Sequence, residues 1–95
     1  MGNRECEAIA SCLRTNVSLQ ELLLHGNRIE DGGVMSLGLS LTNNRSLKIL
    51  DLTDNGIGND GLKELALGLQ GNTCLTLLYL GGEHRRFTTR GLRSL

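Results

Sequence analysis

Three glycines in the middle of the chain have the spacing of a phosphate-binding loop. Gly56, Gly58 and Gly61 spell G-x-G-x-x-G between an apolar run and an amphipathic run, and Glu83 follows about 20 residues later. In dinucleotide-binding folds, such glycines let the backbone approach a pyrophosphate, and the later acid binds the ribose. This spacing therefore offers one chemical hypothesis, a nucleotide-binding enzyme, which the rest of the chain has to support.

The other chemically active side chains form no constellation. His25 and His84 are isolated, and Cys6, Cys12 and Cys74 are odd in number and show no C-x-x-C spacing. Zinc sites and disulfide frameworks need paired or clustered ligands. We therefore expect no catalytic residues, no metal and no cofactor, and a reduced, cytoplasmic chain.

Composition narrows the class of partner. The 95 residues suit one small domain or part of a larger one, and their formal net charge of +0 argues against a nucleic-acid surface. No apolar run approaches the ~18 residues that a membrane span needs. With nucleic acid and a membrane span both disfavoured, we expect the partner to be a protein.

The whole chain repeats with a period of 28 residues. The period places Leu19, Leu47 and Leu75 in one column, and it carries Gly33 to Gly61. Repeats must be recognised before motifs, because a missed repeat gives the wrong fold. In the preceding copy, Arg28 and Glu30 stand where Gly56 and Gly58 stand, so only Gly61 belongs to the repeat. Nucleotide binding at this loop is therefore the weaker interpretation.

The copies divide the chain into a half repeat (1–18), two repeats (19–46 and 47–74) and an incomplete one (75–95). The last copy needs two extra residues in the run GGEHRRF before Phe87, Thr89, Gly91 and Leu92 return to register with the first turn of a helix. We expect a single domain that is a fragment of a longer array. The Glu83–Arg86 run is either a solvated bulge or a basic contact loop.

Two periodicities alternate within each copy. Leu22 and Leu24 begin a period-two pattern typical of a strand with one buried face, and it recurs in the next two copies. Positions 34, 37, 38 and 41 have the i, i+3, i+4, i+7 spacing of a helix buried along one stripe. The small residues Ala10, Gly38 and Ala66 predict a close approach of helix and strand.

Polar columns mark the predicted helix ends. The column Asn3, Asp31, Asn59 and Thr89 contains good N-caps, and Gly33 and Gly61 in the first turn allow close packing. The predicted helices end near a second column, where asparagine is able to take the left-handed conformation: Asn16, Asn44 and Asn72. The sequons at Asn16 and Asn44 coincide with these exits, so we interpret them as structural rather than glycosylated.

The runs LQELLLHGNRI (Leu19 to Ile29) and LKILDLTDNGI (Leu47 to Ile57) resemble the leucine-rich repeat family. The repeat length with a full helix is similar to the ribonuclease-inhibitor-like subclass, and the texture is similar to the leucine-rich regions of NOD-like receptors. This resemblance implies an α/β solenoid, a short horseshoe segment with parallel strands on the concave face and helices on the convex face. The crossovers should be right-handed. The resemblance also implies that Asn27 and Asn55 are structural, satisfying backbone groups at the strand exits.

The outward residues of the three predicted strands form the candidate binding site. Tyrosine is favoured at binding hot spots, and here Tyr79 lies in a mixed patch of apolar and acidic residues. The predicted partner-binding residues are Glu21, Leu23, His25, Ile49, Asp51, Thr53, Leu77 and Tyr79. The leading function is a non-enzymatic protein-binding module.

Two other functions stay open. Arg85 or Arg86 could assist GTP hydrolysis if the chain were a GTPase-activating fragment, because such arginines stabilise phosphoryl transfer. The chain could also self-associate through its C-terminal end, where an uncapped repeat would expose Leu78, Leu80 and Leu92.

Overall fold

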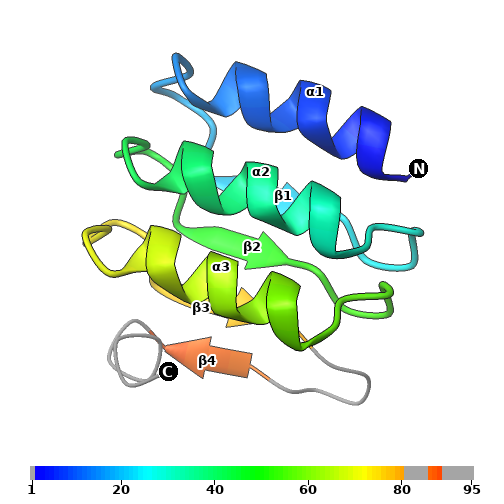
Figure 1. The fold of residues 1–95 in the computed structure, drawn as a ribbon. Helices are drawn as coiled ribbons and strands as arrows, with labels where there is room; N and C mark the ends of the chain where they lie inside the picture. Colours follow the sequence, from blue (N-terminus) through cyan, green and yellow to red (C-terminus); the bar gives the residue numbers. More distant parts are fainter. Residues whose placement is uncertain (1, 81–85, 89–95) are drawn as a thin grey trace.

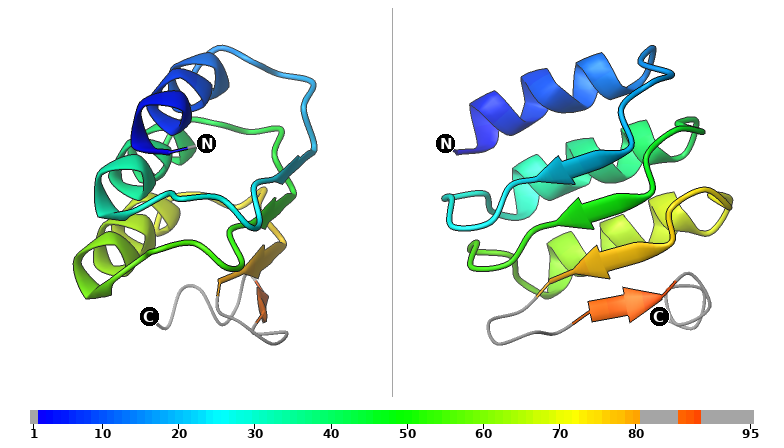
Figure 2. Two further views of the ribbon diagram at one scale, coloured as in Figure 1. Left: turned by 90° about the vertical axis from the view of Figure 1, so that its right-hand side faces the viewer. Right: turned by 180° about the vertical axis from the view of Figure 1, so that it is seen from behind.

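The computed structural model describes residues 2–80 and 86–88, which form two layers, one of helices and one of strands (Figures 1 and 2). The helices are α1 (Asn3–Leu13), α2 (Asp31–Leu41) and α3 (Asn59–Leu69). The strands are β1 (Glu21–Leu23), β2 (Ile49–Asp51), β3 (Leu77–Tyr79) and β4 (Arg86–Thr88). One sheet contains all four strands in the order β1-β2-β3-β4.

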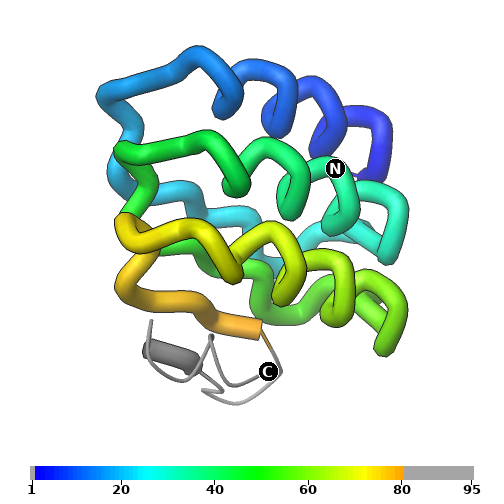
Figure 3. The backbone as a smooth tube through the Cα atoms, turned by 60° about the vertical axis from the view of Figure 1, so that its left-hand side comes forward, coloured from blue at the N-terminus to red at the C-terminus, as the bar shows by residue number. Residues whose placement is uncertain are grey.

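The chain winds as a coil in which each turn adds one strand and one helix (Figure 3). β1, β2 and β3 are parallel, and their register matches Leu22 to Leu50 and Leu50 to Leu78. These partners are the leucines that the 28-residue period had aligned. The predicted α/β solenoid with parallel strands is confirmed.

A core of leucine lies between the two layers. Leu50 and Leu78, the central residues of β2 and β3, are fully buried and face the helices. From α2, Val34, Leu37 and Leu41 are also fully buried, as their helical spacing predicted. Burial of such side chains is the main favourable contribution to folding, about 1.5–3 kcal/mol each.

The last strand departs from the predicted repeat. β4 pairs antiparallel with β3, matching Leu78 to Phe87, where the sequence register had predicted the approach to another helix. Pairing occupies the outer edge of β3, whose N–H and C=O groups would otherwise be left open. Leu78, expected to be exposed at this end, is buried, so that expectation is wrong. Leu92 and the helix start expected at Thr89 lie outside the described residues.

Two of the predicted N-caps, Asn3 and Asp31, bond the following repeat rather than their own helices. Helices begin at Asn3 and Asp31, but their cap positions are Gly2 and Glu30, and neither of these residues caps its helix with its own side chain; at Gly2, the backbone amide donates to Glu5 Oε1 at 2.8 Å. The Asn3 carboxamide oxygen instead accepts from the amides of Glu30 (2.8 Å) and Gly33 (3.1 Å). The prediction of local capping is therefore wrong, because each side chain reaches the next repeat.

The asparagines expected to close the helices also join repeats. The helices end at Leu13, Leu41 and Leu69, and Asp54 is the only non-glycine residue with positive φ in the described part of the chain. The prediction that Asn44 has a left-handed backbone conformation is therefore wrong. Its side chain is buried instead, with four hydrogen bonds to the backbone.

These four bonds tie Asn44 to its own turn and to the preceding one. Its Nδ2 donates to Leu13 O (2.9 Å) and Asn16 O (3.3 Å), and its Oδ1 accepts from Ser46 N (3.0 Å) and Leu47 N (2.8 Å). Asn72 repeats this pattern one turn later, donating to the Leu41 and Asn44 carbonyls. We call this column, Asn16, Asn44 and Asn72, the asparagine ladder.

Small residues bring helix against helix, not helix against strand. A Cβ on Gly38 would lie 2.9 Å from Glu64 O of α3, and a Cβ on Gly68 would overlap the Gly38 carbonyl. The expected approach of Gly38 to the strand is therefore wrong, since its open side meets the neighbouring helix. The glycines set the spacing of α2 and α3.

Candidate protein-binding face

The sheet has one covered and one open face (Figure 2). Because side chains alternate along a strand, the residues flanking the central leucine of β1, β2 and β3 point away from the helices. Register places Glu21, Ile49 and Leu77 in one row and Leu23, Asp51 and Tyr79 in the next. We call these six residues the outer sheet face. They are six of the eight residues that the sequence singled out for partner binding.

The outer sheet face combines apolar groups with two acids. Leu23 is 58% exposed, which is high for a leucine on a sheet. Ile49, Leu77 and Tyr79 are half-buried, so each retains accessible surface. Exposed Glu21 and half-buried Asp51 supply the charge. The arrangement suits contact with another macromolecule more than chemistry on a small substrate.

The other two predicted residues lie where the strands end, beside Asp51. Thr53 donates its backbone N–H to Asp51 Oδ1 at 3.0 Å. His25 Nδ1 lies 3.7 Å from Asp51 Oδ2, and the two side chains are 65% and 21% exposed. The structure therefore brings His25 and Thr53 together with Asp51 at one end of the face.

Asparagines just beyond the strands hold the loops that support this face. The Asn55 amide donates to Leu24 O (2.9 Å), Leu52 O (3.0 Å) and Thr53 O (3.3 Å), and its Oδ1 accepts from Ile29 N (3.0 Å). Asn27 donates similarly to the carbonyls of Leu24 and His25. Both side chains satisfy backbone groups at the strand exits, which would be costly to leave unpaired.

The glycine loop is not a phosphate cradle. The Gly56 amide donates to Ile29 O at 2.8 Å, and the Gly58 amide donates to Asp31 Oδ1 at 2.7 Å. The amides that would hold a pyrophosphate are thus occupied, and a carboxylate lies where phosphate would bind. A Cβ on Gly61 would come within 2.5 Å of that same Asp31 oxygen. The dinucleotide hypothesis is wrong, because the glycines here accommodate the preceding repeat.

Two cysteines differ sharply in environment. Cys6 is buried and its Sγ donates to Gly33 O at 3.4 Å; burial raises the pKa of its thiol to about 11. Cys12 is exposed. A thiol that stays protonated is a poor nucleophile. Cys6 is therefore a packing residue.

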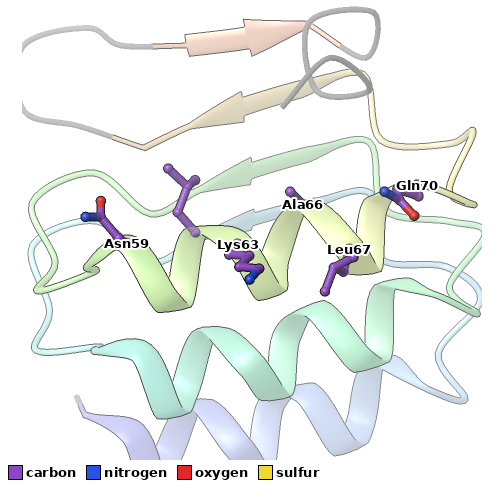
Figure 4. A pocket seen from close by; sticks show the side chains of 6 residues that line it. Asn59, Lys63, Ala66, Leu67 and Gln70 are labelled. Carbon is purple, nitrogen blue, oxygen red and sulfur yellow. The ribbon is translucent and has the colours of Figure 1, made fainter.

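A hollow beside α3 is lined by Asn59, Leu62, Lys63, Ala66, Leu67 and Gln70 (Figure 4). Asn59 and Ala66 point into it, away from α2, and Lys63 and Leu67 lie along its border. Among the described residues, its lining includes no histidine, cysteine or acid. Within residues 2–80 and 86–88, no group of three or more His, Cys, Asp and Glu could hold a metal ion, and no helix is long and apolar enough to span a bilayer.

Sequence reasoning missed a second set of exposed apolar side chains. Met35 (43%), Leu39 (63%) and Leu67 (50%) project from the solvent side of α2 and α3. They border a hollow with Glu64 and Thr42. The available signal was the column Ser11, Leu39 and Leu67, in which the first copy is polar and the others are not.

Of the two arginines considered for GTPase activation, only Arg86 lies among the described residues. Arg86 lies in β4 opposite Tyr79, while residues 81–85, which include Arg85 and most of the Glu83–Arg86 run, lie outside the described part.

Comparison with known proteins agrees with the repeat architecture. The family model described as "Leucine Rich repeat" matches residues 15–38 and 43–66. A search of curated proteins gave no match. Among solved structures, this chain is similar to one titled "Leiomodin-1 Actin-Binding Site 2 (ABS2)", with a TM-score of 0.83 and 21% sequence identity. The similarity covers 90% of this chain and 49% of that one, so this chain spans about half its length.

Proposed function

Because the chain belongs to the leucine-rich repeat family, whose repeats generally mediate protein–protein interaction, we propose that it binds a protein partner through the outer sheet face. The observation that carries this proposal is the exposure of Leu23, 58%, at one end of a row that continues with Asp51 and Tyr79. An exposed apolar side chain that adjoins further apolar residues and an aromatic ring forms a patch of the kind that marks protein interaction sites. The proposed role is non-enzymatic, and within the family we infer similarity to the ribonuclease-inhibitor-like subclass and NOD-like receptors.

The size of the face limits the affinity of the chain alone. A standard interface uses about 20–30 residues on each side, whereas the outer sheet face has six, with His25 and Thr53 beside them. We infer weak binding by the isolated chain and stronger binding when further repeats extend the sheet. A cytoplasmic setting suits the three free cysteines.

A test compares two faces of the molecule. The variant Tyr79→Ala with Asp51→Lys removes an aromatic group and reverses a charge on the outer sheet face. The matched control, Leu39→Ser with Leu67→Ser, changes two exposed residues on the helix layer toward the residue found in α1. We expect the first to abolish partner capture and the second to preserve it. Unchanged capture by the first variant would refute the proposal.

Self-association is a second candidate function, and we place it at the β1 edge of the sheet rather than at the C-terminal end that the sequence suggested. β4 covers the edge of β3, while no described strand pairs with the other edge of β1. Beside that edge lies a hollow lined largely by apolar side chains, including Ile9, Leu19 and Leu22. Light scattering over a concentration series measures the molecular mass; a monomer at the highest concentration would rule this candidate out.

A further inference from the structure

We propose that the outer sheet face recognises a cationic side chain of its protein partner, with arginine preferred, seated on Asp51 between Leu23 and Tyr79; this inference rests on the proposed function. Charge complementarity is its starting point. The six residues of the outer sheet face include two acids, Glu21 and Asp51, and no base; Arg86 of β4, the base next in the row, is the register partner of Tyr79 and not of Asp51. An acid alone on a sheet would not indicate a specific ligand. The Asp51 carboxylate, however, has a fixed orientation and lies between Leu23 and Tyr79.

The Asp51 carboxylate is held in one orientation. Its Oδ1 accepts the Thr53 amide at 3.0 Å, which fixes the group against the end of its own strand. Its Oδ2 lies 3.7 Å from His25 Nδ1, too far for a good hydrogen bond. No other ion pair forms among the described residues. A partner cation therefore has an acceptor that is already positioned, with little ordering cost.

The two neighbours of Asp51 favour a guanidinium. Leu23 and Tyr79 are its register partners on the adjacent strands, about 4.8 Å away on either side. A phenol ring attracts a cation lying over its face, and a planar guanidinium stacks there better than an ammonium. Leu23 offers apolar surface to the methylene stem of the same side chain. In this row, Asp51 would bind the charge of an arginine, Tyr79 its planar guanidinium and Leu23 its methylene stem.

A bound metal ion would be a poor occupant. Calcium takes about 6–8 oxygen ligands and magnesium about six. The described residues include no group of three metal-binding side chains. An organic cation with one charged head and an apolar stem fits the surroundings of Asp51 better.

The test uses a short peptide and its neutral isostere. We would titrate the isotope-labelled chain with acetyl-Gly-Arg-Leu-Gly-amide at millimolar concentration and follow backbone amide shifts. Citrulline in place of arginine keeps the shape and removes the charge. The same titrations on Asp51→Asn keep an oxygen for the Thr53 amide but remove the carboxylate. Leu39→Ser serves as the matched surface control.

We expect the arginine peptide to shift amides of β1, β2 and β3, and citrulline or Asp51→Asn to weaken binding about tenfold, as for loss of a charged hydrogen bond. Leu39→Ser should bind normally. Equal binding of both peptides, shifts confined to the helices, or no binding at millimolar concentration would overturn the inference. If partner capture still required Tyr79 in that case, the proposed function would stand without it.

Discussion

Replacing Asn44 with alanine tests how the repeats are held together. The side chain is 2% exposed and makes four hydrogen bonds to the backbone, two donated to carbonyls of the preceding turn and two accepted from amides of its own. Alanine removes all four and leaves buried backbone groups without partners. Asn16 provides a matched control, because it occupies the same column but is exposed, and among the described residues its side chain accepts only from Ser18 N and Leu19 N.

The magnitude follows from these contacts. Each intramolecular hydrogen bond contributes about 1 kcal/mol net, and buried groups left unpaired cost more. We expect Asn44→Ala to lower the free energy of unfolding by about 3–4 kcal/mol, and Asn16→Ala by about 1 kcal/mol or less. For a domain of this size, the larger change corresponds to a Tm lower by about 12–30 °C.

Urea unfolding followed by circular dichroism measures both variants against the parent chain. An unchanged slope with a lower midpoint would show lost stability rather than a changed unfolded state. Equal effects of Asn44→Ala and Asn16→Ala would refute the reasoning, because the two differ in burial and in contacts with the preceding turn. A loss below ~1 kcal/mol at Asn44 would do the same.

Three further predictions concern packing and reactivity. Gly68→Ala should destabilise the chain by about 1–3 kcal/mol, since its Cβ would overlap the Gly38 carbonyl; Gly71→Ala, with open space around it, should be nearly neutral, and thermal melts of both decide. Cys12 should react with iodoacetamide at pH 8 while Cys6 stays unmodified until the chain unfolds, which mass spectrometry detects; rapid native labelling of Cys6 would contradict its burial and raised pKa. Raising the pH from about 9 toward 11 should lower stability, because the pKa of Cys6 is raised in the fold and the unfolded chain releases that proton first; Cys6→Ala should weaken this dependence, and an unchanged pH profile would argue against it.

The sheet was predictable because burial imposes a strict pattern on it. A one-residue slip of β2 would turn Leu50 outward and Ile49 inward, so the alternating leucines determine which residues face the helices. Once three copies share a period, the register between neighbouring strands follows. The sequence alone therefore predicts the rows of the outer sheet face.

Contacts between repeats were harder to predict. A column such as Asn16, Asn44 and Asn72 shows which residues are equivalent, but not which atoms of the next turn lie within reach. Local rules assigned Asn44 to a helix end and Asp31 to a cap; in the fold, both bridge to the neighbouring repeat. The signal was present in the asparagine that all three copies share.

The antiparallel strand β4 was not predicted for a different reason. The prediction for this segment extended the 28-residue period of the earlier copies across the run GGEHRRF. Two extra residues in that run already break the period. Only the pairing of Leu78 with Phe87 shows that the chain reverses there. Extrapolation fails where the period itself fails.

The most direct test of the proposed binding face is site-specific photo-crosslinking. A benzophenone amino acid placed at Thr53, at the end of β2, reports on partners of the outer sheet face, and the same group at Leu39 reports on the helix layer. We predict crosslinking of the captured partner from position 53 and none from position 39. Crosslinking from position 39 alone would contradict the assignment of binding to the sheet.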